Sequence, residues 1–151
     1  MKSEDASKYT TRTERFVDEL FGPGMGARHV QFLDKLENPA LREMIHRYHP
    51  VEQDVSEVSL IENYMIGMAV LSATGHLPTA VMFAKVLRHL GVSRSKILEV
   101  AGRLGMWIGG LPAAEVSFAV QRALNEYEAQ GLQSLEVWFP PLEASEEGGD
   151  P

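Results

Sequence analysis

Two titratable side chains, His76 and Glu62, have the residue types and the spacing that acid–base chemistry would use. His76 follows Gly75 and precedes a helix that we predict to begin near Pro78. It would therefore lie at a helix N-terminus, where anionic groups are favoured. Glu62 lies on a predicted helix that is otherwise apolar on almost every face, and burial there would raise its pKa and suit it to a proton shuttle. The alternatives are an exposed, locally hydrogen-bonded histidine and a glutamate paired with an arginine.

Three further residues are candidates for the walls of a binding pocket. Tyr64 and Trp107 each combine one hydrogen-bond donor with a large apolar surface, and packing of their rings in the core is the alternative. Glu115 lies in the first turn of a predicted helix, where the helix dipole alone would also explain a carboxylate. We expect these residues to surround His76 and Glu62.

Neither a metal nor a cofactor is predicted. The chain has no cysteine, which excludes disulfides, thiolate metal sites and cysteine nucleophiles. His46 and His49 share one helical face, but no third metal ligand lies near them in the sequence. Walker, dinucleotide-binding, catalytic-serine and zinc signatures are also absent from the sequence. Any catalysis is therefore expected to be acid–base chemistry.

The composition is that of one globular domain with a negative net charge. The 151 residues are 44% apolar and 23% charged, with a formal net charge of −7. This balance argues against binding to nucleic acid or to an anionic membrane surface. The longest apolar run, Met65–Leu71, is far shorter than the roughly 20 residues that span a bilayer. With a polar N-terminal segment unlike a signal peptide, the sequence predicts a cytoplasmic protein.

Apolar residues recur at helical spacing along the chain, and no strand-pairing pattern is present. The sequence predicts an all-α fold with one domain at residues 11–142, a flexible leader at 1–10 and a disordered acidic tail at 143–151. The segment LEVWFPP, residues 135–141, is interpreted as extended. The expected helices cover residues 13–21 with Thr13 as the cap, about 30–36, 39–49 with Asn38 as the cap and Pro50 as the end, 57–73, 78–90 ended by Gly91, 93–108 capped by Ser93, and 112–130.

Four consecutive segments between Leu60 and Asn125 carry a family resemblance. They read ENYMIGMAVLSATGH, LPTAVMFAKVLRHLGV, SRSKILEVAGRLGMWIGG and LPAAEVSFAVQRAL, with the strongest local matches at Leu90–Ser93, Glu99 and Gly109–Ala114. In helix order and glycine placement they resemble the carboxymuconolactone decarboxylase family, which includes alkylhydroperoxidase D-like proteins. The resemblance covers rather less than half of the chain. It implies an alkylhydroperoxidase D-like helical bundle that forms a dimer, trimer or hexamer through the long apolar helix.

The residues at the family's active-site positions differ from those of its catalytic members. Peroxidase members carry two cysteines, whose positions fall on His76 and Thr79, and a histidine, shared with the decarboxylases, whose position falls on Phe83. Thiol peroxidase chemistry is excluded, because a sulfur must be oxidised and then resolved by a second sulfur. The family's acidic proton-relay position falls on Tyr64, two residues from Glu62.

Two functions follow from this interpretation. The first is a cofactor-independent lyase, decarboxylase or isomerase that acts on a small anionic organic compound, with His76 as acid or base and Glu62 as its partner. The second is a non-catalytic oligomeric family member that binds a small ligand or a protein partner. The polar groups at the turn favour the first function, and Phe83, which exchanges no proton, favours the second. The expected substrate-binding residues are Tyr64, Thr79, Phe83, Trp107 and Glu115.

Overall fold

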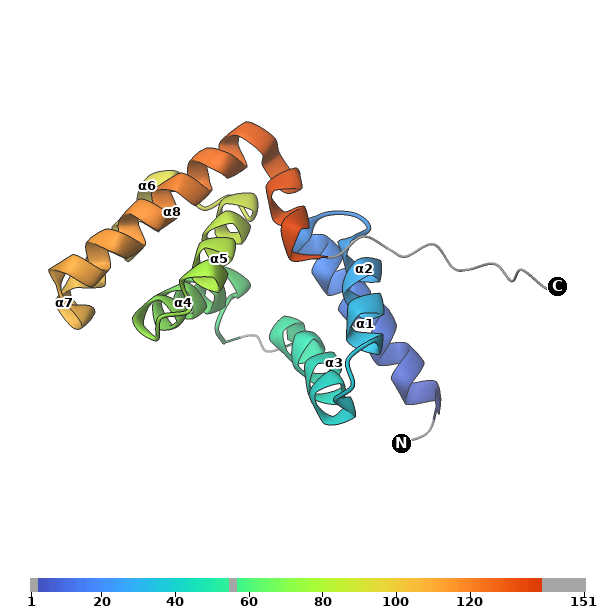
Figure 1. Cartoon of the computed structure of the whole chain (residues 1–151). Helices are drawn as coiled ribbons and strands as arrows, with labels where there is room; N and C mark the ends of the chain where they lie inside the picture. The colour runs from blue at the N-terminus through green and yellow to red at the C-terminus, as the bar shows by residue number, and fades with distance from the viewer. Residues whose placement is uncertain (1–2, 55–56, 140–151) are drawn as a thin grey trace.

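The secondary structure is helical throughout the described part of the chain, which confirms the predicted all-α class. The computed structural model describes residues 3–54 and 57–139 (Figure 1), and no strand occurs among them. None of the helices in these ranges has the length and apolarity needed to pass through a membrane. The elements are α1 (Ser3–Phe21), α2 (Met25–Asp34), α3 (Pro39–Asp54), α4 (Leu60–Ala73), α5 (Leu77–His89), α6 (Arg94–Arg103), α7 (Gly105–Ile108), α8 (Gly110–Gln130) and the 3₁₀ helix η1 (Gly131–Trp138).

The helices form two groups that η1 connects. α1, α2 and α3 form one group, and α4 to α8 form the other (Figure 1). In the larger group α4 and α5 make a helical hairpin, and α8 packs against both α5 and α6. η1 then carries the chain from the end of α8 back to α1. The two groups therefore meet where α1, α5 and η1 come together.

Apolar stripes from both groups face a shared core. Phe16 of α1, Met68 of α4, Leu87 of α5, Leu124 of α8 and Leu135 of η1 are almost completely buried. All five belong to one contiguous cluster of buried side chains. Burying each such side chain contributes roughly 1.5–3 kcal/mol. The packing of α5 against its neighbours therefore depends mainly on apolar contact.

Short polar residues and a glycine set several helix ends as predicted. Asn38 caps α3, because its Oδ1 accepts a hydrogen bond from the backbone N–H of Leu41 at 3.0 Å. Ser93 caps α6 in the same way, accepting from the N–H of Lys96 at 3.3 Å. Gly91, which follows α5, has a φ of 90°, a left-handed conformation that residues with a Cβ rarely adopt. These three predicted ends are confirmed.

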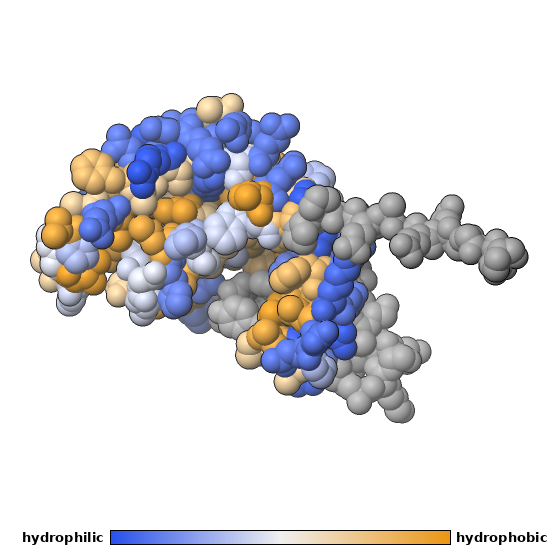
Figure 2. Space-filling view, viewed as in Figure 1, coloured by the Kyte–Doolittle hydropathy of each residue, from blue (hydrophilic) through white to orange (hydrophobic). Residues whose placement is uncertain are grey.

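One end of the molecule carries large exposed apolar side chains. Figure 2 shows hydrophobic surface at the end where α7 and the start of α8 lie. Met106 and Trp107 of α7 are 82% and 83% exposed, and Leu111 of α8 is 76% exposed. Contact of such side chains with water is unfavourable. We refer to these three residues as the α7–α8 apolar surface.

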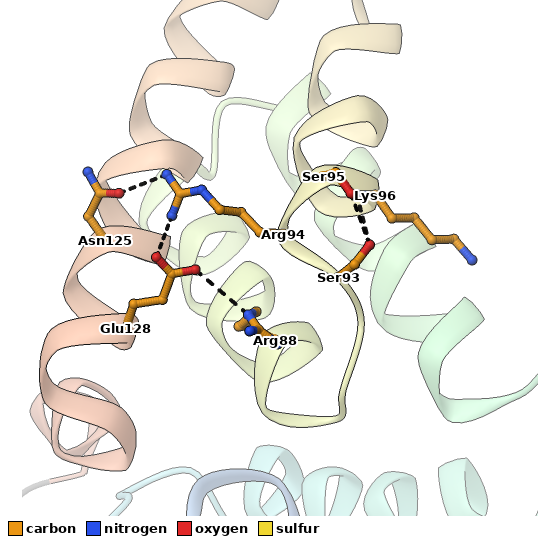
Figure 3. A network of polar contacts seen from close by, with 7 residues as sticks. All are labelled: Arg88, Ser93, Arg94, Ser95, Lys96, Asn125 and Glu128. Carbon is orange, nitrogen blue, oxygen red and sulfur yellow. Dashed lines mark hydrogen bonds and ion pairs between the residues drawn. The ribbon is translucent and has the colours of Figure 1, made fainter.

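A polar network holds the turn between α5 and α6 against α8 (Figure 3). Arg94 donates hydrogen bonds to Oδ1 of Asn125 at 2.7 Å and to Oε2 of Glu128 at 2.9 Å. Arg88 lies 3.8 Å from the other carboxylate oxygen of Glu128. Exposed ion pairs contribute little stability individually, at most about 1 kcal/mol. The network therefore serves mainly to set the register of α6 on α8.

α1 and α2 approach each other closely at a glycine. Gly26 is buried in the first turn of α2, and a Cβ at this position would overlap the carbonyl oxygen of Glu14 in α1. The backbone N–H of Gly26 donates to Oδ1 of Asp18 at 2.7 Å. Asp18 therefore satisfies a free N–H at the start of α2, as a capping residue would.

Three predicted boundaries in the N-terminal group are wrong. α2 begins at Met25 and not near residue 30. α1 begins at Ser3, and Thr13 lies inside it with a completely buried side chain. The hydroxyl of Thr13 is 3.4 Å from Nδ1 of His46 in α3, so it contacts a neighbouring helix instead of capping its own. α3 continues through Pro50 to Asp54, because a proline removes one backbone hydrogen bond but leaves the adjacent turns intact. The predicted acidic tail, residues 143–151, lies outside the described residues.

Two predictions in the C-terminal half are also wrong. The helix expected at residues 93–108 is divided after Arg103, and Gly105–Ile108 form the separate helix α7. The segment interpreted as extended is largely part of η1. Leu135 is completely buried whereas Val137, two residues later, is 82% exposed, which is not the alternation of a strand. The two prolines that follow are compatible with either conformation, and the burial of Leu135 favours the helical one.

Gly26→Ala is expected to lower the free energy of unfolding by about 1–3 kcal/mol or more, because the added methyl group forces α1 and α2 apart. Gly102→Ala in α6 is the matched control. No atom lies within 4 Å of a Cβ at Gly102, so this change should stabilise the helix by roughly 0.5–1 kcal/mol. Urea unfolding followed by circular dichroism measures both. Equal stabilities of the two variants would contradict the close approach of α1 and α2.

Candidate functional site

An apolar cleft lies where the two helix groups meet. Its volume is about 520 Å³, within the range of about 300–1,000 Å³ that is usual for small-molecule sites. α1 and α2 form one side, α4 and α5 form another, and the end of η1 forms a third. The lining residues are Val17, Phe21, His29, Phe32, Asn63, Tyr64, Ile66, Gly67, Val70, Met82, Phe83, Trp138 and Phe139.

An aromatic pair forms the wall of the cleft on the side of α4 and α5. The ring centroids of Tyr64 and Phe83 are 4.6 Å apart, a separation at which aromatic rings attract each other beyond simple burial. Gly67 allows this arrangement, because a Cβ there would lie 2.6 Å from Cε2 of Phe83. Tyr64 and Phe83 were both predicted to be binding residues, and both line the cleft.

The end of η1 is fixed against α1 and α2. The ring of Phe139 packs edge-on against Phe21, with centroids 4.9 Å apart, and against the ring of His29, at 5.7 Å. Arg28 donates a hydrogen bond to the backbone carbonyl of Phe139. The same guanidinium lies 3.7 Å from the carboxylate of Glu136. These contacts hold Phe139 at the edge of the cleft.

A second, charged hollow adjoins the cleft between α5, α8 and η1. Its volume is about 430 Å³, and Met82 and Trp138 line both spaces. Lys85 is only 4% exposed, and its Nζ donates to Oε2 of Glu126 at 2.7 Å and to the backbone carbonyl of Ser134 at 2.9 Å. The complete lining is Leu77, Pro78, Val81, Met82, Lys85, Ala119, Arg122, Ala123, Glu126, Val137 and Trp138.

His76 lies in an exposed turn and lines neither the cleft nor the charged hollow. It is the residue before α5, as predicted, but its side chain makes no capping hydrogen bond to the helix. Thr79, in the first turn of α5, is half-buried and likewise lines neither space. The turn therefore presents its polar groups away from the cleft.

Glu62 caps its own helix, and the expectation that burial would raise its pKa is wrong. Its carboxylate accepts hydrogen bonds from the hydroxyl of Ser59 at 2.6 Å and from the backbone N–H of Ser59 at 2.8 Å. These two bonds hold the pKa of the exposed Glu62 carboxyl below its ordinary value. His76 lies beyond the other end of α4, a 14-residue helix of about 20 Å. The structure does not bring the two predicted catalytic residues together.

Trp107 and Glu115 do not line the cleft either. Trp107 is almost fully exposed on α7, so neither the pocket-wall interpretation nor the core alternative describes it. Glu115 is exposed in α8 and borders a smaller hollow of about 360 Å³. That hollow also includes Ser72, at the end of α4. The predicted set of binding residues is therefore divided between separate places on the molecule.

The described side chains offer no metal site. No group of three histidine, aspartate or glutamate residues lies close enough to hold an ion in that part of the chain. His46 faces Thr13, and the side chain of His49 lies outside the described residues.

Most of the cleft was not predicted from the sequence. The lining also includes four residues that were not predicted as site residues: Phe21, Phe32, Trp138 and Phe139. They come from the two ends of the described chain, so no local spacing connects them. A phenylalanine or tryptophan near the end of a helix can either line a cleft or pack in the core, and the sequence around it does not distinguish the two. Only the return of η1 to α1 brings them together.

Comparison with known proteins gives no assignment. Family models, curated proteins and solved structures were compared with the chain, and none of them matches. The function is therefore inferred from the geometry of the described residues.

The pKa of Glu62 provides a direct test of its capping role. In the intact protein it should lie below the ordinary glutamate value, and Ser59→Ala should raise it by removing the largest stabilising bond to the carboxylate. A lowered folded-state pKa stabilises the fold above the unfolded-state pKa, and this contribution is lost as the pH falls through the folded-state pKa. NMR titration of the side-chain carbon measures both values. A raised pKa in the intact protein would restore the proton-shuttle interpretation.

Proposed function

We propose that the protein binds a small apolar organic molecule in the cleft between α1, α2, α4, α5 and η1, and that it does so without acid–base catalysis. The observation that carries this proposal is the composition of the lining. Nine of its thirteen members carry aliphatic, thioether or phenyl side chains or the indole of Trp138, and none is a carboxylate or a lysine. Such a surface favours apolar ligands over charged ones.

The family resemblance supports the same proposal. The positions where catalytic members would have a proton-relay acid and a histidine fall on Tyr64 and Phe83. Here these residues form a ring pair 4.6 Å apart on the cleft wall. A phenyl ring exchanges no proton. We infer that a cleft which serves chemistry in related folds has become an apolar binding space in this chain.

The arrangement of His76 and Glu62 favours binding over the lyase hypothesis. A general acid–base pair has to reach one substrate, within about 3 Å of the atoms that exchange protons. Glu62 lies in the first turn of α4 and His76 lies beyond the other end of that helix, and Glu62 is already engaged with Ser59. One small substrate therefore cannot contact both side chains, as acid–base catalysis by this pair would require.

Binding of 1-octanol, a neutral apolar probe, tests the proposal. Protein-observed NMR should show saturable shifts at residues of the cleft. Phe32→Asp, at a 45% exposed position on the wall, should weaken binding by about tenfold because it places a charge beside the alkyl chain. Phe118→Asp is the matched control, since Phe118 is an exposed phenylalanine of α8 that lines none of these spaces. Absence of saturation, or equal loss in both variants, would refute the proposal.

We also propose that the protein forms a homo-oligomer that covers the α7–α8 apolar surface. The family resemblance implies an assembly, although it places the contact on the long apolar helix. In the structure α4 buries Tyr64 and Met68 within the chain and exposes Ile66 and Val70 by more than half. Met106, Trp107 and Leu111 are considerably more exposed. A second copy is the occupant that would remove this surface from water in a pure solution.

The assembly is tested by the double change of Trp107→Glu and Leu111→Glu. Charges placed in the contact should convert the oligomer into monomers with unchanged helical content, as measured by sedimentation velocity and circular dichroism. Met44→Glu is the control, because Met44 is exposed on α3, across the molecule from α7 (Figure 1), and should leave the assembly intact. A monomeric unmodified protein at high concentration would disprove the assembly.

A further inference from the structure

The apolar cleft and the charged hollow share two walls. Met82 of α5 and Trp138 at the end of η1 line both spaces. One space is lined mostly by apolar groups, and the other contains Lys85, Arg122 and Glu126. Methionine is unbranched and adapts its shape to neighbouring molecules. A ligand of sufficient length can therefore occupy the cleft and reach the charged groups past Met82.

The charged hollow has one more positive charge than it has negative charges. Lys85 is paired with Glu126 at 2.7 Å, which neutralises the only carboxylate on the lining. Arg122 has neither an ion pair nor a hydrogen bond to any part of the chain that the structure describes. Within the same part, Lys85 uses two of its three donors, on Glu126 and on the Ser134 carbonyl. A locally positive hollow in a chain of net charge −7 points to an anionic group of the ligand.

We propose that the ligand is an amphiphilic monocarboxylate, with its hydrocarbon body in the apolar cleft and its carboxylate on Arg122 and Lys85. This inference rests on the proposed function, because it assumes that the cleft holds the apolar part. Arg122 offers a planar pair of donors that matches a carboxylate, and the unused donor of Lys85 supplies a third bond. One added negative charge balances the hollow.

Other head groups fit the hollow less well. A dianionic group would leave an excess negative charge beside Glu126. An ammonium group would face Lys85 and Arg122 at close range in a partly buried space, where like charges repel strongly. A neutral hydroxyl would leave the charge of Arg122 unbalanced. The charges of these three residues therefore select a monoanion.

Octanoate and 1-octanol, which have the same chain length and differ in the head group, test this inference at neutral pH. The unmodified protein should bind octanoate roughly tenfold more tightly than octanol, as expected for charge-assisted hydrogen bonds in a partly exposed site. Arg122→Gln should remove most of this preference without changing the affinity for octanol. Arg103→Gln is the matched control, because Arg103 pairs with Glu99 on α6 and lines neither space. Isothermal titration calorimetry provides the dissociation constants.

The possible results separate this inference from the proposed function. Equal binding of octanoate and octanol would leave the apolar cleft as a site and overturn the carboxylate inference alone. A preference for octanoate that survives Arg122→Gln, or that Arg103→Gln reduces equally, would also overturn it. Failure of both probes to bind would overturn the proposed function and this inference together. Octylamine binding as tightly as octanoate would show that the hollow does not select charge.

Discussion

The arrangement of the cleft depends on one buried ammonium group. Nζ of Lys85 joins the carboxylate of Glu126 in α8 to the backbone carbonyl of Ser134 in η1, and so it fixes the angle at which the chain leaves α8. The Lys85 side chain is only 6% exposed and that of Glu126 is 47% exposed, so removing Glu126 would leave a buried ammonium group with less compensation. The direction of η1, and with it the position of Trp138 and Phe139 on the cleft wall, follows from this contact.

Local sequence signals predicted most of the helices but not the way in which they meet. Asn38, Ser93 and Gly91 act within one helical turn, so their roles were readable from neighbouring residues. Thr13 has the type of a capping residue and lies inside α1, because its contact is with His46, which is 33 positions away. The division between α6 and α7 and the 3₁₀ conformation of η1 likewise depend on packing that no short window of sequence contains.

The candidate site was likewise predicted only where local sequence features were sufficient. The residue type of Tyr64 and the family resemblance at Phe83 led to two predicted residues that line the cleft, whereas the opposite wall comes from α1, α2 and η1. Glu62 illustrates the limit for a single residue: its apolar neighbours indicated burial, but Ser59 three positions earlier makes it a capping residue. A short polar motif at a helix start therefore outweighs the hydrophobicity of the helix that follows.

Two basic side chains attach η1 and the residue that follows it to the neighbouring helices. Lys85 fixes one end of this segment to α8, and Arg28 fixes the other end to α2. Neither side chain lines the apolar cleft. Loosening the attachment at Arg28 would let the rings of Trp138 and Phe139 swing outward while the aromatic wall on α4 and α5 stays in place. The outer wall of the cleft therefore depends on Arg28, a residue that does not itself line the cleft.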